Sequence, residues 1–84
     1  MPDKKNTDIL LIIPAYNEEG NISRVVDNLI SNYKDLDYVV VNDGSRDNTA
    51  KICYEKSYNI LDLPINLGLA GAFQAGMKYA YKYN

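Results

Sequence analysis

Residues 9–21 read ILLIIPAYNEEGN, and the rest of the fold follows from this stretch. Its first part, residues 9–13, is a short, continuous apolar run, which is typical of a central parallel strand buried on both faces. We expect Pro14 to end this strand, because proline has no N–H to offer a neighbouring strand. Asn21 then predicts the start of a helix, because its side chain can accept a hydrogen bond from an N–H group of the first turn.

The alternation of helix and strand continues along the chain. The first helix carries an apolar stripe at helical spacing, made up of Ile22, Val25, Val26, Leu29, Ile30 and Tyr33. A second strand is expected at 38–41, followed by a second helix that Ser45 or Asp47 would cap and that runs through Ser57. The predicted inner face of that helix consists of Ala50, Cys53 and Tyr54.

A weaker third strand, 58–61, ends near Pro64, and a third helix begins near Leu69. One face of this helix carries Phe73, Met77, Ala80 and Tyr81 at helical spacing. Gly71 and Gly76 cost the helix about 1 kcal/mol each relative to alanine. We therefore expect these two glycines where the helix packs closely on the sheet.

This order of elements predicts an α/β fold, a Rossmann-like βαβαβα half of a doubly wound sheet with three parallel strands and right-handed crossovers. Ligands bind such sheets beyond the carboxyl ends of the strands, so the three following loops should open onto one edge. The loops carry Tyr16, Asn17 and Glu18, then Asp43, Gly44 and Ser45, then Asn66 and Gly68. A carboxylate at this edge can accept hydrogen bonds from ribose hydroxyls or from a base N–H.

Structural interpretations of these residues stay open beside the functional ones. Asp43 and Gly44 can form a plain turn, Asp47 is more typical of a helix cap than of a ligand contact, and Cys53 is typical of a small core residue. The chain has neither a G-x-x-x-x-G-K-[ST] phosphate loop nor a G-x-G-x-x-G fingerprint after the first strand. The predicted sheet is therefore Rossmann-like with a different ligand chemistry.

Composition narrows the function classes further. The 84 residues make one small domain or part of a larger one, and the formal net charge of −2 argues against a nucleic-acid partner. Histidine is absent and the single cysteine allows neither an intrachain disulfide nor a cysteine-cluster zinc site. One cysteine fits a reducing compartment, and the longest apolar run is too short to span a bilayer. We expect a cytoplasmic protein.

Three segments carry a resemblance to a known family. Residues 12–19 read IIPAYNEE, residues 41–49 read VNDGSRDNT, and residues 66–76 read NLGLAGAFQAG. In this order and at this spacing they resemble glycosyltransferase family 2, whose fold is of the GT-A nucleotide-diphospho-sugar transferase type. The resemblance implies that residues 1–84 are the N-terminal nucleotide-binding segment of a glycosyltransferase domain, without the later D-x-D motif and the acceptor half.

The resemblance also implies residue roles. The donor-nucleotide pocket would comprise Pro14, Ala15, Tyr16, Glu18, Asp43, Gly44, Asn66 and Gly68. Asp43 would hydrogen-bond the base, and Glu18 would lie near the base or the ribose. No catalytic residue and no metal ligand is expected in this chain. The divalent Mg²⁺ or Mn²⁺ expected in the full-length enzyme would be ligated by later residues.

The implied reaction transfers a sugar from a UDP- or GDP-linked donor to an acceptor. The third segment looks closest to the branch resembling dolichyl-phosphate mannose synthase, which implies a polyprenyl phosphate acceptor at the cytoplasmic membrane face; a polysaccharide acceptor is the other option. Two alternatives stay open, a nucleotidyltransferase-like enzyme and a non-catalytic nucleotide-binding or assembly module. The first would need a Gly- and Arg-rich loop after strand one, whereas residues 16–20 contain one glycine and no arginine.

The strand order of a GT-A sheet has a consequence for association. In the expected order three-two-one, strand one, residues 9–13, is an edge that pairs onward only with a fourth strand. An unpaired apolar edge invites another chain, and a two-fold dimer lets one patch complement itself. We therefore expect a homodimer through strand one.

Overall fold

Helices and strands alternate strictly in the computed structural model, which describes residues 10–83. In chain order the elements are β1 (Leu10–Ala15), α1 (Ile22–Asn32), β2 (Asp37–Asp43), α2 (Thr49–Glu55), β3 (Ile60–Leu63) and α3 (Gly68–Tyr83). The strands form one parallel sheet in the order β1-β2-β3. The predicted α/β fold and the predicted strand order three-two-one are both confirmed.

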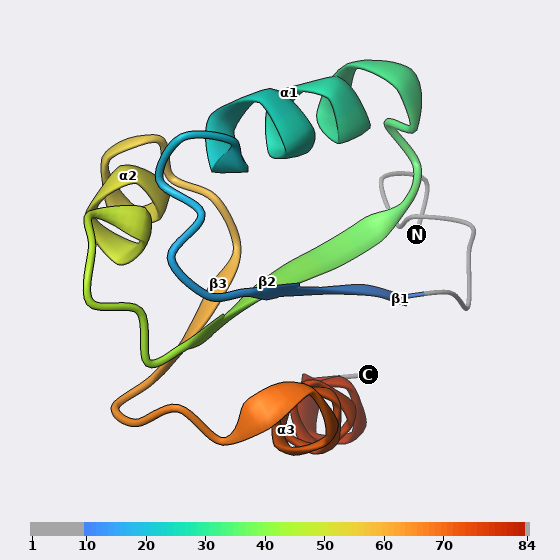
Figure 1. The fold of residues 1–84 in the computed structure, drawn as a ribbon. Helices are drawn as coiled ribbons and strands as arrows, with labels where there is room; N and C mark the ends of the chain where they lie inside the picture. The colour runs from blue at the N-terminus through green and yellow to red at the C-terminus, as the bar shows by residue number, and fades with distance from the viewer. Residues whose placement is uncertain (1–9, 84) are drawn as a thin grey trace.

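The sheet lies between two layers of helices, with α1 and α2 on one face and α3 on the other (Figure 1). β2 is the central strand, and its valines alternate between the faces. Val40 belongs to the core under α1 and α2, whereas Val39 and Val41 pack with Ala72 of α3. All three valines are fully buried. A strand that is buried on both faces needs apolar residues at successive positions, which explains the continuous apolar run in the sequence.

β1 extends further than the sequence predicted. Pro14 lies opposite Val41 and Ala15 lies opposite Asn42, so Pro14 does not end the strand. Proline is tolerated there because β1 is the edge strand of the described sheet. Ile9, the expected first residue of the strand, lies outside the described residues.

The predicted end of α2 and the predicted start of β3 were both wrong by two residues. Ser57 has a left-handed φ of 58°, and the N–H of Tyr58 donates to the carbonyl of Cys53 at 2.9 Å. The chain therefore turns at 57–58, where the sequence predicted continuous helix and then strand. α2 ends at Glu55, and β3 begins at Ile60.

α1 and α2 bury narrower faces than their sequence patterns predicted. In α1, Ile22 and Val26 are buried and Leu29 is half-buried, but Val25 and Ile30 are exposed, as is Tyr33 directly after the helix. In α2, Cys53 is buried as predicted and Ala50 is half-buried. Tyr54 is exposed, whereas Thr49, which was not predicted to face inward, is buried. A helix contacts a sheet along one line, so the flanking members of a wide apolar stripe stay outside the contact.

α3 packs on the sheet mainly through small residues, and this face differs from the apolar face that the sequence pattern indicated. The residues toward the sheet are Ala72, Ala75, Gly76 and Tyr79, all buried or half-buried. Phe73 and Met77, which belong to the apolar face found in the sequence, are 42% and 59% exposed. Ala80 is half-buried, and the side chain of Tyr81 lies outside the described part of the structure. Small residues let the helix approach closely, which turns the bulky residues away.

Gly76 is the point of closest approach. A Cβ atom on Gly76 would lie 2.6 Å from Cγ2 of Ile12 in β1. The predicted close packing on the sheet is thus confirmed for Gly76. It is wrong for Gly71, where a Cβ atom would meet the side chain of Leu67, at 2.5 Å, instead of a strand.

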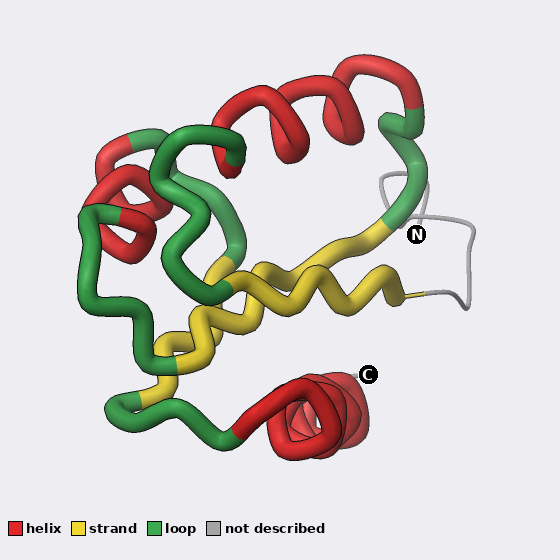
Figure 2. The backbone as a smooth tube through the Cα atoms, in the orientation of Figure 1, coloured by secondary structure: helices red, strands yellow, loops and turns green. Residues whose placement is uncertain are grey.

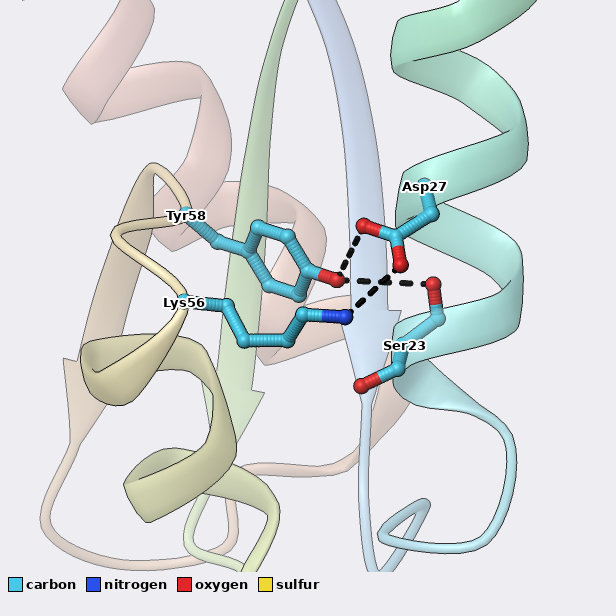
Figure 3. A network of polar contacts seen from close by, with 4 residues as sticks. All are labelled: Ser23, Asp27, Lys56 and Tyr58. Atoms are coloured by element: carbon cyan, nitrogen blue, oxygen red, sulfur yellow. Dashed lines mark hydrogen bonds and ion pairs between the residues drawn. The ribbon is translucent and has the colours of Figure 1, made fainter.

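A polar network fastens α1 to the turn between α2 and β3 (Figure 3). Asp27 of α1 accepts a hydrogen bond from the hydroxyl of Tyr58 at 2.6 Å and pairs with Nζ of Lys56 at 2.7 Å. The same hydroxyl lies 3.4 Å from the carbonyl oxygen of Ser23. The hydrogen bonds from Lys56 and Tyr58 hold the pKa of Asp27 below its ordinary value. The network therefore favours the ionised carboxylate.

Gly76→Ala should lower the free energy of unfolding by about 1–2 kcal/mol, measured from urea denaturation. Overpacking against Ile12 costs about 1–3 kcal/mol, which exceeds the gain in helix propensity of up to about 1 kcal/mol. Gly20→Ala is the matched control, because no atom lies within 4 Å of its added methyl group. A Gly76→Ala chain as stable as the unsubstituted one would contradict the close approach of α3.

Asp27→Asn should unfold at a lower urea concentration than the unsubstituted chain near pH 6. Because the pKa of Asp27 is lowered in the folded chain, its contribution is present above the unfolded pKa of about 3.9 and is lost as the pH falls through the lower folded value. The difference between the two chains should therefore vanish in strong acid. It should also shrink in high salt, because both members of the ion pair are partly exposed. A difference that persists at all pH values would point to packing instead of charge.

Candidate functional site

The carboxyl ends of the three strands meet at one edge of the sheet, and the loops that follow them lie there together (Figure 2). These are a first loop (residues 16–21), a second loop (44–48) and a third loop (64–67). The parallel sheet forces this arrangement, because every strand points the same way.

Hydrogen bonds join the first loop to the second in both directions. The N–H of Asn17 donates to Oγ of Ser45 at 2.9 Å, and Oδ1 of Asn17 accepts the N–H of Arg46 at 2.8 Å. Asn17 has a left-handed φ of 54°, a conformation that asparagine adopts more readily than most residues. Glu19 repeats the pattern: its N–H donates to Oδ2 of Asp47 at 3.1 Å, and its Oε1 accepts the N–H of Asn48 at 2.9 Å.

Asp47 and Thr49 form the inner part of this contact. The hydroxyl of Thr49 accepts the N–H of Glu18 at 2.8 Å and donates to Oδ1 of Asp47 at 2.5 Å. The same Oδ1 accepts the N–H of Thr49 at 2.9 Å, at the start of α2. Burial raises the pKa of Asp47, but the hydrogen bonds from Thr49 and from the N–H of Glu19 outweigh it and hold the pKa below its ordinary value.

None of the three predicted caps takes the cap position with its side chain. The residue at the cap of α2 is Asn48, which makes no side-chain cap, and Asp47 lies one residue before it, where its Oδ1 accepts the N–H of Thr49. Ser45 does not cap α2, because its hydroxyl donates to Oδ1 of Asn42. Asn21 precedes α1 but makes no side-chain cap to it; its side chain instead contacts Glu18 at 3.4 Å and Arg24 at 2.9 Å.

Asn42 connects the second loop to the third strand. Its side chain is almost fully buried, accepts the hydroxyl of Ser45 at 2.5 Å, and donates to Oδ1 of Asp62 at 2.7 Å. Oδ2 of Asp62 accepts the hydroxyl of Tyr54 in α2 at 3.3 Å. A line of hydrogen bonds thus crosses the carboxyl ends of the sheet from Asn17 to α2.

Asp43 holds the third loop against the second. Its Oδ1 accepts the N–H of Leu67 at 2.6 Å, and its carbonyl oxygen accepts Nδ2 of Asn66 at 3.1 Å. Gly44 has a φ of +69°, and a Cβ atom there would lie 2.4 Å from the backbone N of Asn66, so only glycine fits. Gly68, with a φ of +79°, donates its N–H to Oδ1 of Asn66 at 3.0 Å.

Comparison with known proteins identifies the family of this chain. A family model described as glycosyl transferase family 2 matches residues 10–82. The chain belongs to glycosyltransferase family 2. The predicted resemblance is therefore confirmed, and the match takes in all three loops.

The curated relatives that this chain matches are much longer than the chain itself. A dolichyl-phosphate beta-glucosyltransferase of Trichomonas vaginalis is 37% identical, with 93% of this chain and 28% of that protein covered. A poly-beta-1,6-N-acetyl-D-glucosamine synthase of Staphylococcus epidermidis is 35% identical, with 89% and 20% covered. An uncharacterized protein of Methanocaldococcus jannaschii is 38% identical, with 90% and 31% covered. The chain thus spans less than a third of each of these relatives.

The structure brings the predicted site residues to one edge but divides them into two groups. Pro14, Ala15 and Glu18 line a hollow of about 180 Å³ beside β1, together with Ile13, Asn21, Ile22 and Val25. Tyr16 follows them with its side chain 44% exposed. Asp43, Gly44, Asn66 and Gly68 lie at the junction of the second and third loops.

Sequence reasoning missed several residues that shape this edge, namely Asn42, Thr49, Glu19 and Asp62 as hydrogen-bond partners. The spacing of Asp47 and Thr49 gave a local signal for a helix start. Their contacts to the first loop gave none, because the partners are 28 and 31 residues apart along the chain.

Acidic side chains at this edge accept hydrogen bonds from protein groups, as Asp47 does from Glu19 and Thr49. Among residues 10–83, no three histidine, cysteine, aspartate or glutamate side chains gather so that they could hold a metal ion.

Burial and the negative charge of Asp62 raise the pKa of the Cys53 thiol, as fits a core residue. None of the helices described between residues 10 and 83 has the length and apolar character needed to cross a membrane.

Proposed function

We propose that this chain supplies the donor-nucleotide pocket of a glycosyltransferase that transfers a sugar from a UDP- or GDP-linked donor to an acceptor. The observation that carries the proposal is the family 2 match over residues 10–82, which spans all three loops of the candidate site. Its physical support is the edge of the sheet itself, where carboxylates and close-packed backbone lie beyond parallel strands, the place where such sheets bind nucleotides.

Asp43 is the residue with the clearest capacity to bind a base. The residue is 4% exposed, its Oδ1 accepts the N–H of Leu67, and no described residue donates a hydrogen bond to its Oδ2. The protein thus orients the carboxylate with one oxygen and leaves the other for a base N–H. Glu18, on the hollow beside β1, would reach the base or ribose, with Pro14, Ala15 and Tyr16 contacting the base.

The relatives differ in what their names say they make. One acts on dolichyl phosphate and another makes a polysaccharide, yet both match the same segment of this chain. A segment that both relatives share is better explained by binding of the activated sugar donor than by recognition of a particular acceptor. We propose a polyprenyl phosphate or a polysaccharide as the acceptor, and a cytoplasmic location, at the membrane face if the acceptor is lipid-linked.

A divalent cation in the whole enzyme would offset the charge of the departing diphosphate. The described residues of this chain do not fit such an ion, because they offer no cluster of three suitable side chains. We therefore assign Mg²⁺ or Mn²⁺ binding to residues beyond this chain, and derive no step through the ion from the residues present.

We further propose that the chain alone forms a two-fold dimer through β1. In the described sheet β1 pairs only with β2, and its residues Leu10 to Pro14 are only half-buried. Val25 of α1 is exposed and lines the hollow next to Ile13 and Pro14. Antiparallel pairing of two β1 strands would cover this edge and join the two sheets.

Asp43→Ala in the complete enzyme should weaken UDP or GDP binding by about 1.5–3 kcal/mol, the range for hydrogen bonds to charged groups. Titration calorimetry measures the change. Asp43→Asn is the sharper variant, because its remaining oxygen can still accept the N–H of Leu67 while its amide replaces Oδ2 and cannot accept a base N–H. Both variants should bind nucleotide more weakly, and unchanged affinity in both would overturn the assignment.

Light scattering of the 84-residue chain should give twice the monomer mass at high protein concentration. Val25→Glu should shift the chain toward monomer, because it places a charge beside the β1 edge. Ile30→Glu is the matched control, since it is equally exposed on α1 but does not line the hollow at β1. A monomer at every concentration would refute the dimer. Because Val25 and Glu18 line the same hollow, nucleotide titration of the Val25→Glu chain tests the donor pocket separately.

A further inference from the structure

Thr49 is a fully buried polar residue that holds a distant piece of backbone. Its hydroxyl accepts the N–H of Glu18 from 31 residues away in the sequence. The hydroxyl hydrogen in turn points to Oδ1 of Asp47. Oδ2 of that same carboxylate accepts the next N–H of the first loop, that of Glu19. Asp47 of the second loop and Thr49, the first residue of α2, therefore hold two successive N–H groups of the first loop.

We propose that Thr49 and Asp47 are positioning residues, which fix the first loop in the conformation that presents Glu18 to the donor nucleotide. The proposal rests on the donor pocket inferred above and deepens it. Glu18 lines the hollow beside β1, so the place of its backbone decides where its carboxylate can reach. Thr49 and Asp47 act through Glu18, without touching the ligand themselves.

The hydrogen-bond inventory explains why this pair suits the task. A threonine hydroxyl can accept one hydrogen bond while donating another, and an ionised aspartate offers two accepting oxygens. Each capacity is used here: Thr49 accepts from Glu18 and donates to Asp47, and Asp47 serves Thr49 and Glu19 with different oxygens. Removing the hydroxyl leaves the N–H of Glu18 without this partner in a partly buried place, which favours a rearranged loop.

Thr49→Val and Thr49→Ser separate the hydroxyl from the packing. Valine keeps the branched shape and loses the hydroxyl, whereas serine keeps the hydroxyl and loses the methyl group. In the 84-residue chain, amide hydrogen exchange of Glu18 reports its hydrogen bond to Thr49, and amide exchange of Val40 in β2 reports global stability. Titration of the same variants with UDP and with GDP, followed by NMR, reports nucleotide binding.

Thr49→Val should lower the protection of the Glu18 amide about tenfold more than that of Val40, and Thr49→Ser should restore it. Thr49→Val should also raise the dissociation constant for UDP or GDP about 5- to 30-fold, the factor for one or two kcal/mol. Equal loss of protection at both amides would mean that Thr49 contributes only to global stability, and would contradict the positioning role. Selective loss at Glu18 with unchanged affinity would overturn the positioning role.

The design also separates this proposal from the one on which it rests. If the unsubstituted chain binds neither UDP nor GDP, the donor pocket is contradicted, while the exchange of Glu18 still decides whether Thr49 holds the loop. If the unsubstituted chain binds and Thr49→Val binds equally well, the pocket stands and the positioning role is wrong.

Discussion

The structure depends on the burial of β2 on both of its faces. Val39, Val40 and Val41 expose no surface, so helices have to cover both sides of the strand. Parallel strands also require long crossovers, and helices supply them. α1 and α2 cross on one face and α3 continues on the other, which leaves β2 in the centre of the described sheet. The same parallel direction sends three loops to one edge, so the packing of a strand determines where polar chemistry can gather.

At that edge the polar side chains hold one another's backbone. Asn17 and Glu19 each exchange hydrogen bonds with the second loop in both directions, and Asp43 accepts the N–H of Leu67 from the third. Short loops make few apolar contacts. Their conformation is therefore fixed by these hydrogen bonds more than by buried apolar surface. Asp43 is thus a structural residue through Oδ1, which joins the end of β2 to the third loop.

Two glycines permit close approaches that an added side chain would disturb. Gly44 lets the second loop approach the backbone of Asn66, and its positive φ disfavours any side chain. Gly76 lets α3 approach Ile12 in β1, which orients the helix with its small residues inward. The exposure of Phe73 and Met77 follows from that orientation, because a helix that packs by its smallest face turns its larger residues outward.

The sequence by itself determined the type and order of the elements, the parallel sheet, and the edge where the motifs meet. Those features depend on local periodicity and on the alternation of strand and helix, which neighbouring residues encode. Only the tertiary structure decided that β1 continues through Pro14, which face of α3 is buried, and that Thr49 and Asp47 hold Glu18 and Glu19. These outcomes depend on contacts between residues far apart in the chain, and a hydrogen bond across 31 positions leaves no periodic trace in the sequence that makes it.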